Sequence, residues 1–324
     1  MAAADSSVPM SYLRGFGQQA SAVVPLTWAV LALSIAVVII IGVLLLGGIF
    51  VRRARGPLFP AARLEVSRTG HGLAWIYIGV GVSGVFLLAT LIWTLLTLAR
   101  VDGPPGKVNL TIEVTGYQWW WQVRYMSDEP SRIITTANEI HIPTGQPVRV
   151  VLLGGDVIHS FWVPRLAGKR DAIPGQRNEM WLEAAQAGRY RGQCGEYCGW
   201  QHAHMAMYVI AESPAVFQAW WNRQLQPAPV PISTKTLRGE NAFVFHCGTC
   251  HTVRGTQAGG KVAPDLTHLM SRSTIAAGTL PTTIATISGW IANPQAIKPG
   301  NRMPVLYPSG PDLEDIRSFL KTLK

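Results

Sequence analysis

Two long uncharged apolar runs near the N-terminus constrain the fold most. The first covers residues 26–50 and the second residues 73–99, and neither contains a charged side chain. A helix of about 20 apolar residues spans the hydrocarbon core of a bilayer, so either run is long enough to cross a membrane with some tilt. A cleavable signal peptide would have a shorter apolar region followed by small residues, whereas arginines follow here. The sequence therefore predicts a membrane-spanning helical hairpin over residues 26–100.

The short loop between the two runs predicts the orientation of the hairpin. It carries five arginines and a single acid, Glu65. Loops rich in Lys and Arg stay on the cytoplasmic side, so we expect residues 1–25 and everything after Arg100 to lie outside the cytoplasm. The five arginines are Arg52, Arg53, Arg55, Arg63 and Arg68.

The exported part has three segments. Residues 101–226 contain short stretches rich in Val, Ile, Trp and Tyr between Gly, Pro and Asp turns, which is typical of an all-β sandwich or small barrel. Residues 227–236 are rich in proline and predict an extended linker. Residues 237–324 return to a helical pattern and predict an all-α domain.

The distribution of charge argues against nucleic acid as a partner. The net charge is +10, but residues 101–225 contain eleven basic and eleven acidic side chains, so the excess lies in the loop of the hairpin and in the last domain. No basic run with interleaved aromatic residues is present, and the predicted export also excludes a nucleic-acid function.

The sequence "CGEYCGWQHAHM" at residues 194–205 combines cysteine, histidine and methionine at short spacing. A disulfide between Cys194 and Cys198 is one reading for an exported chain, but it would need neither His202 nor Met205. Zinc accepts thiolates and imidazoles and seldom selects a thioether. Copper electron-transfer sites use thiolate, imidazole and a weak axial thioether. The pattern therefore favours copper.

Two cysteines on one loop favour a dinuclear copper site, because each sulfur can bridge two metal ions. Each copper then needs one terminal imidazole. The segment "DVIHSFWVP" supplies His159 at a predicted strand start, and adjacent strands of a sandwich would bring it to the loop. His202 and His204 compete for the second place, and the spacing from Cys198 favours His202.

The hairpin, the β-rich domain and the pattern C-x-E-x-C-x-x-x-H-x-x-M together resemble subunit II of haem-copper cytochrome c oxidases. The resemblance implies a cupredoxin-like sandwich that holds the dinuclear centre CuA. It also implies that the backbone carbonyl of Glu196 is a copper ligand, while the Glu196 carboxylate reaches a magnesium ion at the boundary with subunit I. The implied CuA ligands are His159, Cys194, Glu196, Cys198, His202 and Met205.

The aromatic stretch "YQWWWQ" at residues 117–122 has a counterpart in that family. There the stretch is usually His-Gln-Trp-aromatic-Trp, and its first tryptophan lies at the surface over the copper site and admits electrons. The resemblance gives this role to Trp119, while core packing remains the alternative for each ring. Tyr117 replaces the usual histidine.

A second resemblance lies in the tail, where "CGTCH" is the C-x-x-C-H attachment signature of haem c. Cys247 and Cys250 would form thioethers to the haem, and His251 would be the proximal iron ligand. The tail is thus expected to be an all-α class I cytochrome c domain. With two cysteines assigned to copper and two to haem, none is left for a disulfide.

The sequence offers two candidates for the sixth ligand of the haem iron. The segment "KPGNRMP" offers Met303, whereas the competing Met270 fits the core better. The carbonyl of Pro264 would orient the ring of the proximal histidine. His246 and His268 are expected to be peripheral.

The implied function is an electron relay in a respiratory oxidase. Haem c would accept an electron from an upstream donor and pass it to CuA and then to subunit I, which reduces oxygen to water with proton pumping. The expected partners are subunits I and III, and the expected location is the bacterial cytoplasmic membrane with both redox domains on the periplasmic side. Two alternatives are a CuA subunit of a nitric oxide reductase and an exported copper-storage or delivery protein. Glu65 and His71 are the candidates to border a proton path into subunit I.

Overall fold

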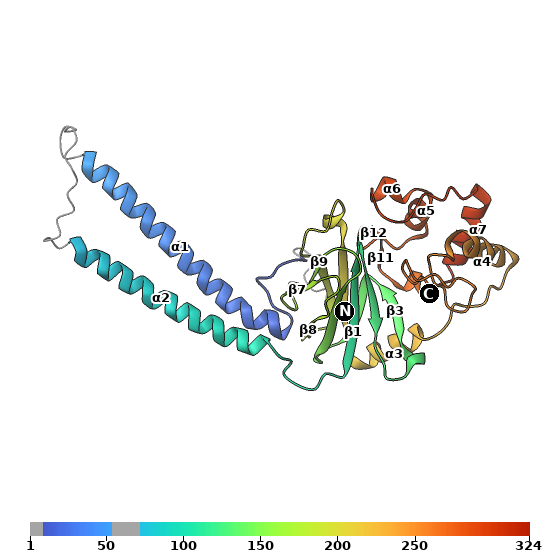
Figure 1. The fold of residues 1–324 in the computed structure, drawn as a ribbon, viewed down its shortest axis with the longest axis horizontal. Coiled ribbons are helices and arrows are strands. Elements are labelled where there is room, and N and C mark those ends of the chain that lie inside the picture. The colour runs from blue at the N-terminus through green and yellow to red at the C-terminus, as the bar shows by residue number, and fades with distance from the viewer. Residues whose placement is uncertain (1–8, 54–71) are drawn as a thin grey trace. The chain divides into compact units, whose positions relative to one another are not determined.

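The computed structural model describes residues 9–53 and 72–324 (Figure 1). The chain divides into two compact units, of which the smaller comprises residues 22–103 and the larger the redox domains. Most of the arginine-rich loop, including Glu65 and His71, lies outside the described residues, so the predicted roles of these two side chains stay predictions.

The smaller unit is a pair of long helices, α1 (Gln18–Arg53) and α2 (Gly72–Val101). Both are long and apolar enough to cross a membrane. Large apolar side chains are exposed along both helices, among them Leu44 and Leu88. Helices that are apolar all round need an apolar surrounding, which for a hairpin of this length is lipid.

The larger unit begins with a sandwich of two five-stranded sheets, with the strand orders β3-β2-β1-β5-β8 and β4-β10-β9-β6-β7. Each sheet contains one parallel pair, β1 with β5 and β4 with β10, and its other pairs are antiparallel. The strands are β1 (Leu110–Tyr117), β2 (Trp120–Tyr125), β3 (Ile134–Ala137), β4 (Glu139–Pro143), β5 (Val148–Gly154), β6 (His159–Trp162), β7 (Lys169–Ala172), β8 (Asn178–Leu182), β9 (Gly188–Cys194) and β10 (Ala206–Glu212).

The alternation of side chains along β2 shows how the sequence forms this sandwich. Trp121, Val123 and Tyr125 are fully buried, and the residues between them are only half-buried. Successive side chains of a strand point to opposite faces, so the apolar set faces the second sheet. The structure confirms the predicted two-helix hairpin followed by a cupredoxin-like all-β sandwich and a helical domain.

The tail domain consists of short helices around a second core. The helix α3 precedes the Pro-rich segment, and α4 begins at Thr234, within the segment predicted as linker. The remaining elements are α3 (Pro214–Gln224), α4 (Thr234–Cys247), β11 (Thr274–Ile275), β12 (Leu280–Pro281), α5 (Ile284–Ala292), α6 (Pro294–Ile297), α7 (Gly310–Leu320) and the 3-10 turns η1 (Pro130–Arg132), η2 (His202–His204) and η3 (Leu269–Ser271).

The helices α4 and α7 cross at close range. A Cβ at Gly239 would lie 2.0 Å from the carbonyl oxygen of Asp315, so only glycine permits this approach. Next to the crossing, the rings of Phe243 and Phe319 pack with centroids 5.6 Å apart. The crossing holds the end of α4, and with it Cys247, in a fixed place.

The sandwich and the tail domain share a buried carboxylate. Glu139 of β4 accepts hydrogen bonds from the backbone N–H of Ser273, at 3.0 Å, and from its hydroxyl. Its other oxygen lies 3.3 Å from the ring of His141. Although burial alone raises the pKa of Glu139, the hydrogen bonds from His141 and Ser273 lower it below the ordinary value. A side chain of the sandwich thus depends on donors from the tail.

Candidate functional site

The copper loop, residues 194–205, connects β9 to β10. The antiparallel pairing of these strands brings the ends of the loop together, and Cys194 N donates to Met205 O at 2.9 Å. Inside the loop Gly199 has φ +111°, in the left-handed region that favours glycine. The sheet therefore fixes both ends of the loop, and the glycine allows it to turn back.

The predicted ligand atoms of the loop gather around two sulfurs. Cys194 Sγ and Cys198 Sγ lie 3.9 Å apart, well beyond the disulfide bond length of about 2.05 Å, and both thiols are free. Cys194 Sγ lies 3.3 Å from Glu196 O. On the other side, Cys198 Sγ lies 3.6 Å from His202 Nδ1 and 3.8 Å from Met205 Sδ. The loop brings five of the six predicted ligands together.

The sixth ligand comes from the neighbouring strand. β6 pairs with β9 so that Phe161 lies opposite Cys194, which places His159 Nδ1 at 3.9 Å from Cys194 Sγ. The ligand atoms of His159, Cys194 and Cys198 all lie within 4.8 Å of one another, and all three side chains are buried. His204, the competing histidine, is exposed and its Nδ1 contacts Gln201 instead.

The donor set fits copper. Two thiol sulfurs lie at the centre, with one imidazole nitrogen beside each, and a thioether and a backbone carbonyl complete the group. Soft sulfur donors with imidazole select copper, and a weak thioether is the usual axial ligand of its electron-transfer sites.

The two thiols influence each other's protonation. The hydrogen bond between them lowers the pKa of Cys194 to about 4 and raises the pKa of Cys198. One thiolate is therefore present at neutral pH, and a bound cation would favour loss of the second proton.

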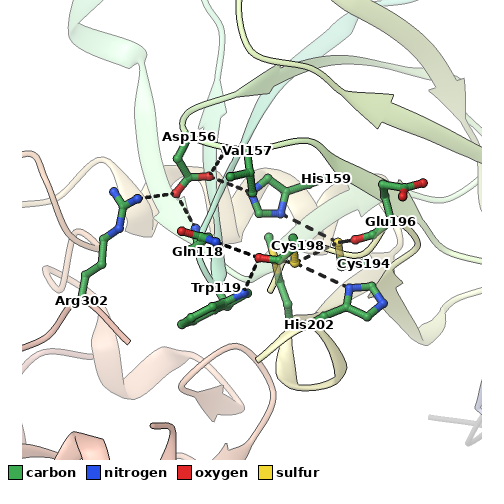
Figure 2. A network of polar contacts seen from close by, with 11 residues as sticks. Gln118, Trp119, Asp156, Val157, His159, Cys194, Glu196, Cys198, His202 and Arg302 are labelled. Atoms are coloured by element: carbon green, nitrogen blue, oxygen red, sulfur yellow. Dashed lines mark hydrogen bonds and ion pairs between the residues drawn. The ribbon is translucent and has the colours of Figure 1, made fainter. Parts of the chain in front are cut away.

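Asp156 orients His159 and connects it to the tail domain (Figure 2). His159 Nε2 donates to Asp156 Oδ1 at 2.9 Å, which leaves Nδ1 free for a metal. Burial lowers the pKa of His159, but its hydrogen bonds to Asp156 and to the thiol raise the pKa above its ordinary value. Asp156 also accepts from the backbone of Gln118 and Val157, and it pairs with Arg302 of the tail at 3.1 Å.

Trp119 does not lie at the surface, where the resemblance would place it. Its side chain is only 7% exposed. Its indole Nε1 donates to Cys198 O at 2.9 Å, next to the copper ligands. The tail covers it, because Lys298 Nζ binds its carbonyl at 2.8 Å and a Cβ on Gly300 would lie 3.6 Å from its ring.

Glu196 and Tyr117 were also singled out in the sequence, and the structure shows their surroundings. The side chain of Glu196, predicted to reach magnesium, is exposed on the copper loop. Tyr117, which replaces the usual histidine, stacks on Trp120 with ring centroids 5.1 Å apart.

A cavity of about 370 Å³ lies at the C-x-x-C-H signature, and its wall includes Trp119 and Trp120 of the sandwich as well as residues of the tail. Cys247 lies at the end of α4, and Cys250 and His251 follow in the next turn. Most of the wall is apolar. The signature residues line this cavity together with Met303 and with Phe243, Leu266, Leu269, Ile275, Ile287, Trp290, Ile291, Leu306 and Leu320.

The proposed axial residues differ in how the structure presents them. His251 Nδ1 donates to Pro264 O at 2.7 Å, as the sequence predicted, so Nε2 is left free for iron. Burial lowers the pKa of His251, and the neutral ring is the form that binds a metal. Met303 lines the cavity, whereas Met270 packs against the domain core.

The surroundings of a buried arginine show whether the residues around the cavity can accommodate haem. Arg272 lines the cavity, and burial lowers its pKa. One of its terminal nitrogens donates to Asp265 O, but its Nε has no partner among the described residues. A buried guanidinium with a free donor needs an anion, and the carboxylates of a haem meet this need. The residues present therefore fit the group.

The two histidines expected to be peripheral have ordinary partners. His268 contacts the backbone carbonyls of Lys324 and Gln226, at 2.6 and 3.1 Å. His246 borders the cavity and lies 3.7 Å from Asp312.

Four residues of the site were missed from the sequence: Asp156, Arg272, Lys298 and Arg302. Asp156 could have been found, since it precedes His159 by three residues. Arg272 gave no signal, because it belongs to no motif. Lys298 and Arg302 gave none, because their partners in the sandwich lie far away in the chain.

Comparisons with known proteins agree with both the copper site and the haem site. The model of the family "Cytochrome C oxidase subunit II, periplasmic domain" matches residues 125–212, and the cytochrome c model matches residues 237–324. Cytochrome c oxidase subunit 2 of Alkalihalophilus pseudofirmus is 34% identical over 269 residues, which cover 80% of this chain and 76% of that protein. The protein of the same name from Bacillus subtilis is 29% identical, over 78% of this chain and 74% of that protein.

Among solved structures, the periplasmic domain of subunit II of cytochrome oxidase from Bradyrhizobium japonicum is 34% identical in sequence. The match covers 37% of this chain and 95% of that chain, with a TM-score of 0.34. Since the relative from Alkalihalophilus pseudofirmus spans most of both chains, and both domain models match in order, this chain belongs to the cytochrome c oxidase subunit II family, in a form with a cytochrome c domain.

Proposed function

We propose that this subunit accepts electrons at a covalently bound haem c and delivers them through a dinuclear CuA centre to subunit I. Oxygen reduction to water and proton pumping take place in that partner. The observation that carries the proposal is the contact between the two candidate sites, in which Arg302, next to the haem-lining Met303, pairs with the aspartate that orients His159.

The residues of the copper loop would hold two metal ions with little rearrangement. Cys194, Cys198, His159 and His202 would hold the copper ions, together with the carbonyl of Glu196 and the thioether of Met205. When bound, the copper ions and the haem supply one-electron redox chemistry. The rigid strands keep the ligands in place in both oxidation states, and this suits electron transfer rather than bond chemistry.

In the tail, Cys247 and Cys250 would attach the haem, and His251 and Met303 would bind its iron. Arg272 would hold its carboxylates. Trp119 transmits the electron, since it lies between the tail and Cys198. The upstream donor therefore meets the tail rather than the indole.

Further parts of the proposal concern the surroundings. The subunit lies in the bacterial cytoplasmic membrane with its redox domains on the periplasmic side, and subunit III completes the complex. The exposed carboxylate of Glu196 reaches a shared magnesium ion at subunit I.

The proposal is tested on the purified oxidase. We expect two copper ions per chain with a delocalised mixed-valence resonance spectrum, and haem that stays bound through denaturation. Flash reduction of the haem should be followed by copper reduction at a rate that is independent of protein concentration and only weakly dependent on salt. A single localised copper signal, or a rate proportional to concentration, would contradict it. Uptake of nitric oxide instead of oxygen would identify the alternative reductase.

Deletion of residues 227–324 gives a second test. The shortened subunit should retain its copper, but turnover should require added cytochrome c and should fall more steeply with salt, since a diffusing donor replaces a tethered one.

A further inference from the structure

Lys298 is a lysine of the tail that is buried against the sandwich. It follows α6 and is only 2% exposed. Its Nζ donates to three backbone carbonyls, Ala276 O at 3.1 Å and, across the domain boundary, Trp119 O and His204 O, both at 2.8 Å. An ammonium has three N–H donors, so every donor has an acceptor.

The two acceptors in the sandwich belong to the segments that flank the copper ligands. Trp119 lies between β1 and β2, and its indole donates to Cys198 O. His204 lies in the copper loop, between the proposed ligands His202 and Met205. Lys298 therefore holds two separate parts of the copper site from one point in the tail.

The segment that follows Lys298 continues along the same surface. Gln201 Nε2 of the copper loop donates to Pro299 O at 2.9 Å. A Cβ on Gly300 would lie 3.6 Å from the rings of both Trp119 and Trp200. Met303, the proposed haem ligand, comes three residues later. Trp119 and Lys298 both line the haem cavity, so the position of Lys298 fixes how this part of the tail sits on Trp119.

Burying the charge of this lysine costs free energy of desolvation. Packing contacts alone would not require a charged side chain at this place. Its three partners are uncharged carbonyls, and no carboxylate among the described residues is paired with it. Burial lowers the pKa of Lys298 to about 7. A methionine would fill the same space without desolvating a charge. The arrangement is therefore best explained by a need for directional bonds at this point.

We propose that Lys298 is a positioning residue for electron transfer between the two redox centres, which anchors the tail over Trp119 and the copper loop. The proposal rests on the proposed function, because it assumes that electrons cross this boundary. It predicts that the exposed charges of the tail contribute little to docking.

The test compares Lys298→Met in the intact oxidase with Lys321→Met, which removes the same charge from an exposed position of the tail. Two backbone amides report docking without any electron transfer, since Ala206 N donates to Ala277 O at 3.1 Å and Ser273 N donates to Glu139. We expect hydrogen exchange of peptides containing these amides to rise at least tenfold in Lys298→Met and to stay unchanged in Lys321→Met.

The rate from haem to copper, measured after flash reduction, should fall at least tenfold in Lys298→Met and depend on solvent viscosity, because the tail must then search for its docked position. The haem and copper spectra should remain those of the parent. Unchanged exchange and an unchanged rate would overturn the proposal. Because Lys298 also lines the haem cavity, loss of haem with unchanged exchange would overturn it as well, since the lysine would then support the pocket and not the docking of the tail. If the parent enzyme itself transfers no electron between the centres, the proposed function fails, while the exchange data still decide whether Lys298 anchors the tail.

Discussion

The copper site and the haem site of this subunit are built in opposite ways. The copper ligands come from one loop and one adjacent strand, and their atoms are already gathered with their hydrogen-bond partners in place. The haem ligands extend from Cys247 to Met303 and surround a cavity of about 370 Å³. The copper site thus lies within one small part of the sandwich, whereas the haem site draws on residues from most of the tail and on the turn between β1 and β2.

The largest effect should come from preventing haem attachment with Cys247→Ala and Cys250→Ala. Most of the cavity wall is apolar, so without haem these side chains lose their packing partner and the tail is destabilised. We expect limited proteolysis to degrade the tail and spare the sandwich. A tail as resistant as that of the parent would remove the contrast between the two sites.

Cys198→Ser should abolish the dinuclear copper signal and leave the sandwich folded. The sheets hold both ends of the loop without the metal, so circular dichroism of the copper-free protein should still show the sandwich. Glu196→Gln serves as the control, because only its backbone carbonyl is proposed as a ligand. Equal loss of copper in the two variants would contradict the assignment of Glu196.

Met303→Ala should convert a six-coordinate haem iron into one that binds external ligands. Met270→Ala, in the same domain, should change stability but not coordination, since Met270 packs against the core. Binding of cyanide or carbon monoxide, followed by absorbance, distinguishes them. If Met270→Ala binds the external ligands and Met303→Ala does not, the sixth ligand is Met270.

The docking of the tail should strengthen as pH rises. Burial lowers the pKa of Lys298 to about 7 from 10.5, so the docked form binds fewer protons between these values. Docking should therefore tighten by up to about tenfold per pH unit above pH 7 and level off below it. Hydrogen exchange at the backbone amide of Ala206, corrected for the intrinsic pH dependence of exchange, measures this. Lys298→Met is the control, and its docking should not depend on pH. The titratable or charged groups nearby are Cys198, His204, His251, Arg272 and Arg302.

The smallest effect should come from Arg302→Gln. Without the guanidinium, the negative charge of Asp156 is less compensated. His159 then becomes a stronger electron donor to the metal, which favours the oxidised form of copper. The copper potential should fall. Because the Arg302 side chain is 63% exposed, we expect only a twofold to fivefold change in the haem–copper electron equilibrium, about 0.4–1 kcal/mol. Spectroelectrochemical titration measures it, and Arg302→Lys should restore most of the difference.

The sequence was informative wherever a site is local. The pattern from Cys194 to Met205 lies on one loop, and His159 followed from the expectation that neighbouring strands share an edge. The contact of Lys298 with Trp119 joins residues 179 positions apart, and no spacing rule reaches that far. The burial of Trp119 was missed for the same reason, since it depends on how two domains meet and not on the pattern within either.

The shared carboxylate of Glu139 affects how this subunit is to be dissected. The Pro-rich segment looks like the natural place to cut, but a sandwich produced without the tail keeps Glu139 and loses both donors of Ser273. A buried carboxylate without those donors has a higher pKa, so the shortened protein should be less stable than the whole subunit at neutral pH, and this difference should shrink as the solution becomes more acidic. Spectra of an isolated copper fragment would then describe a slightly different protein. A fragment that also carries Glu139→Gln is the better reference, because its amide carries no charge to leave uncompensated.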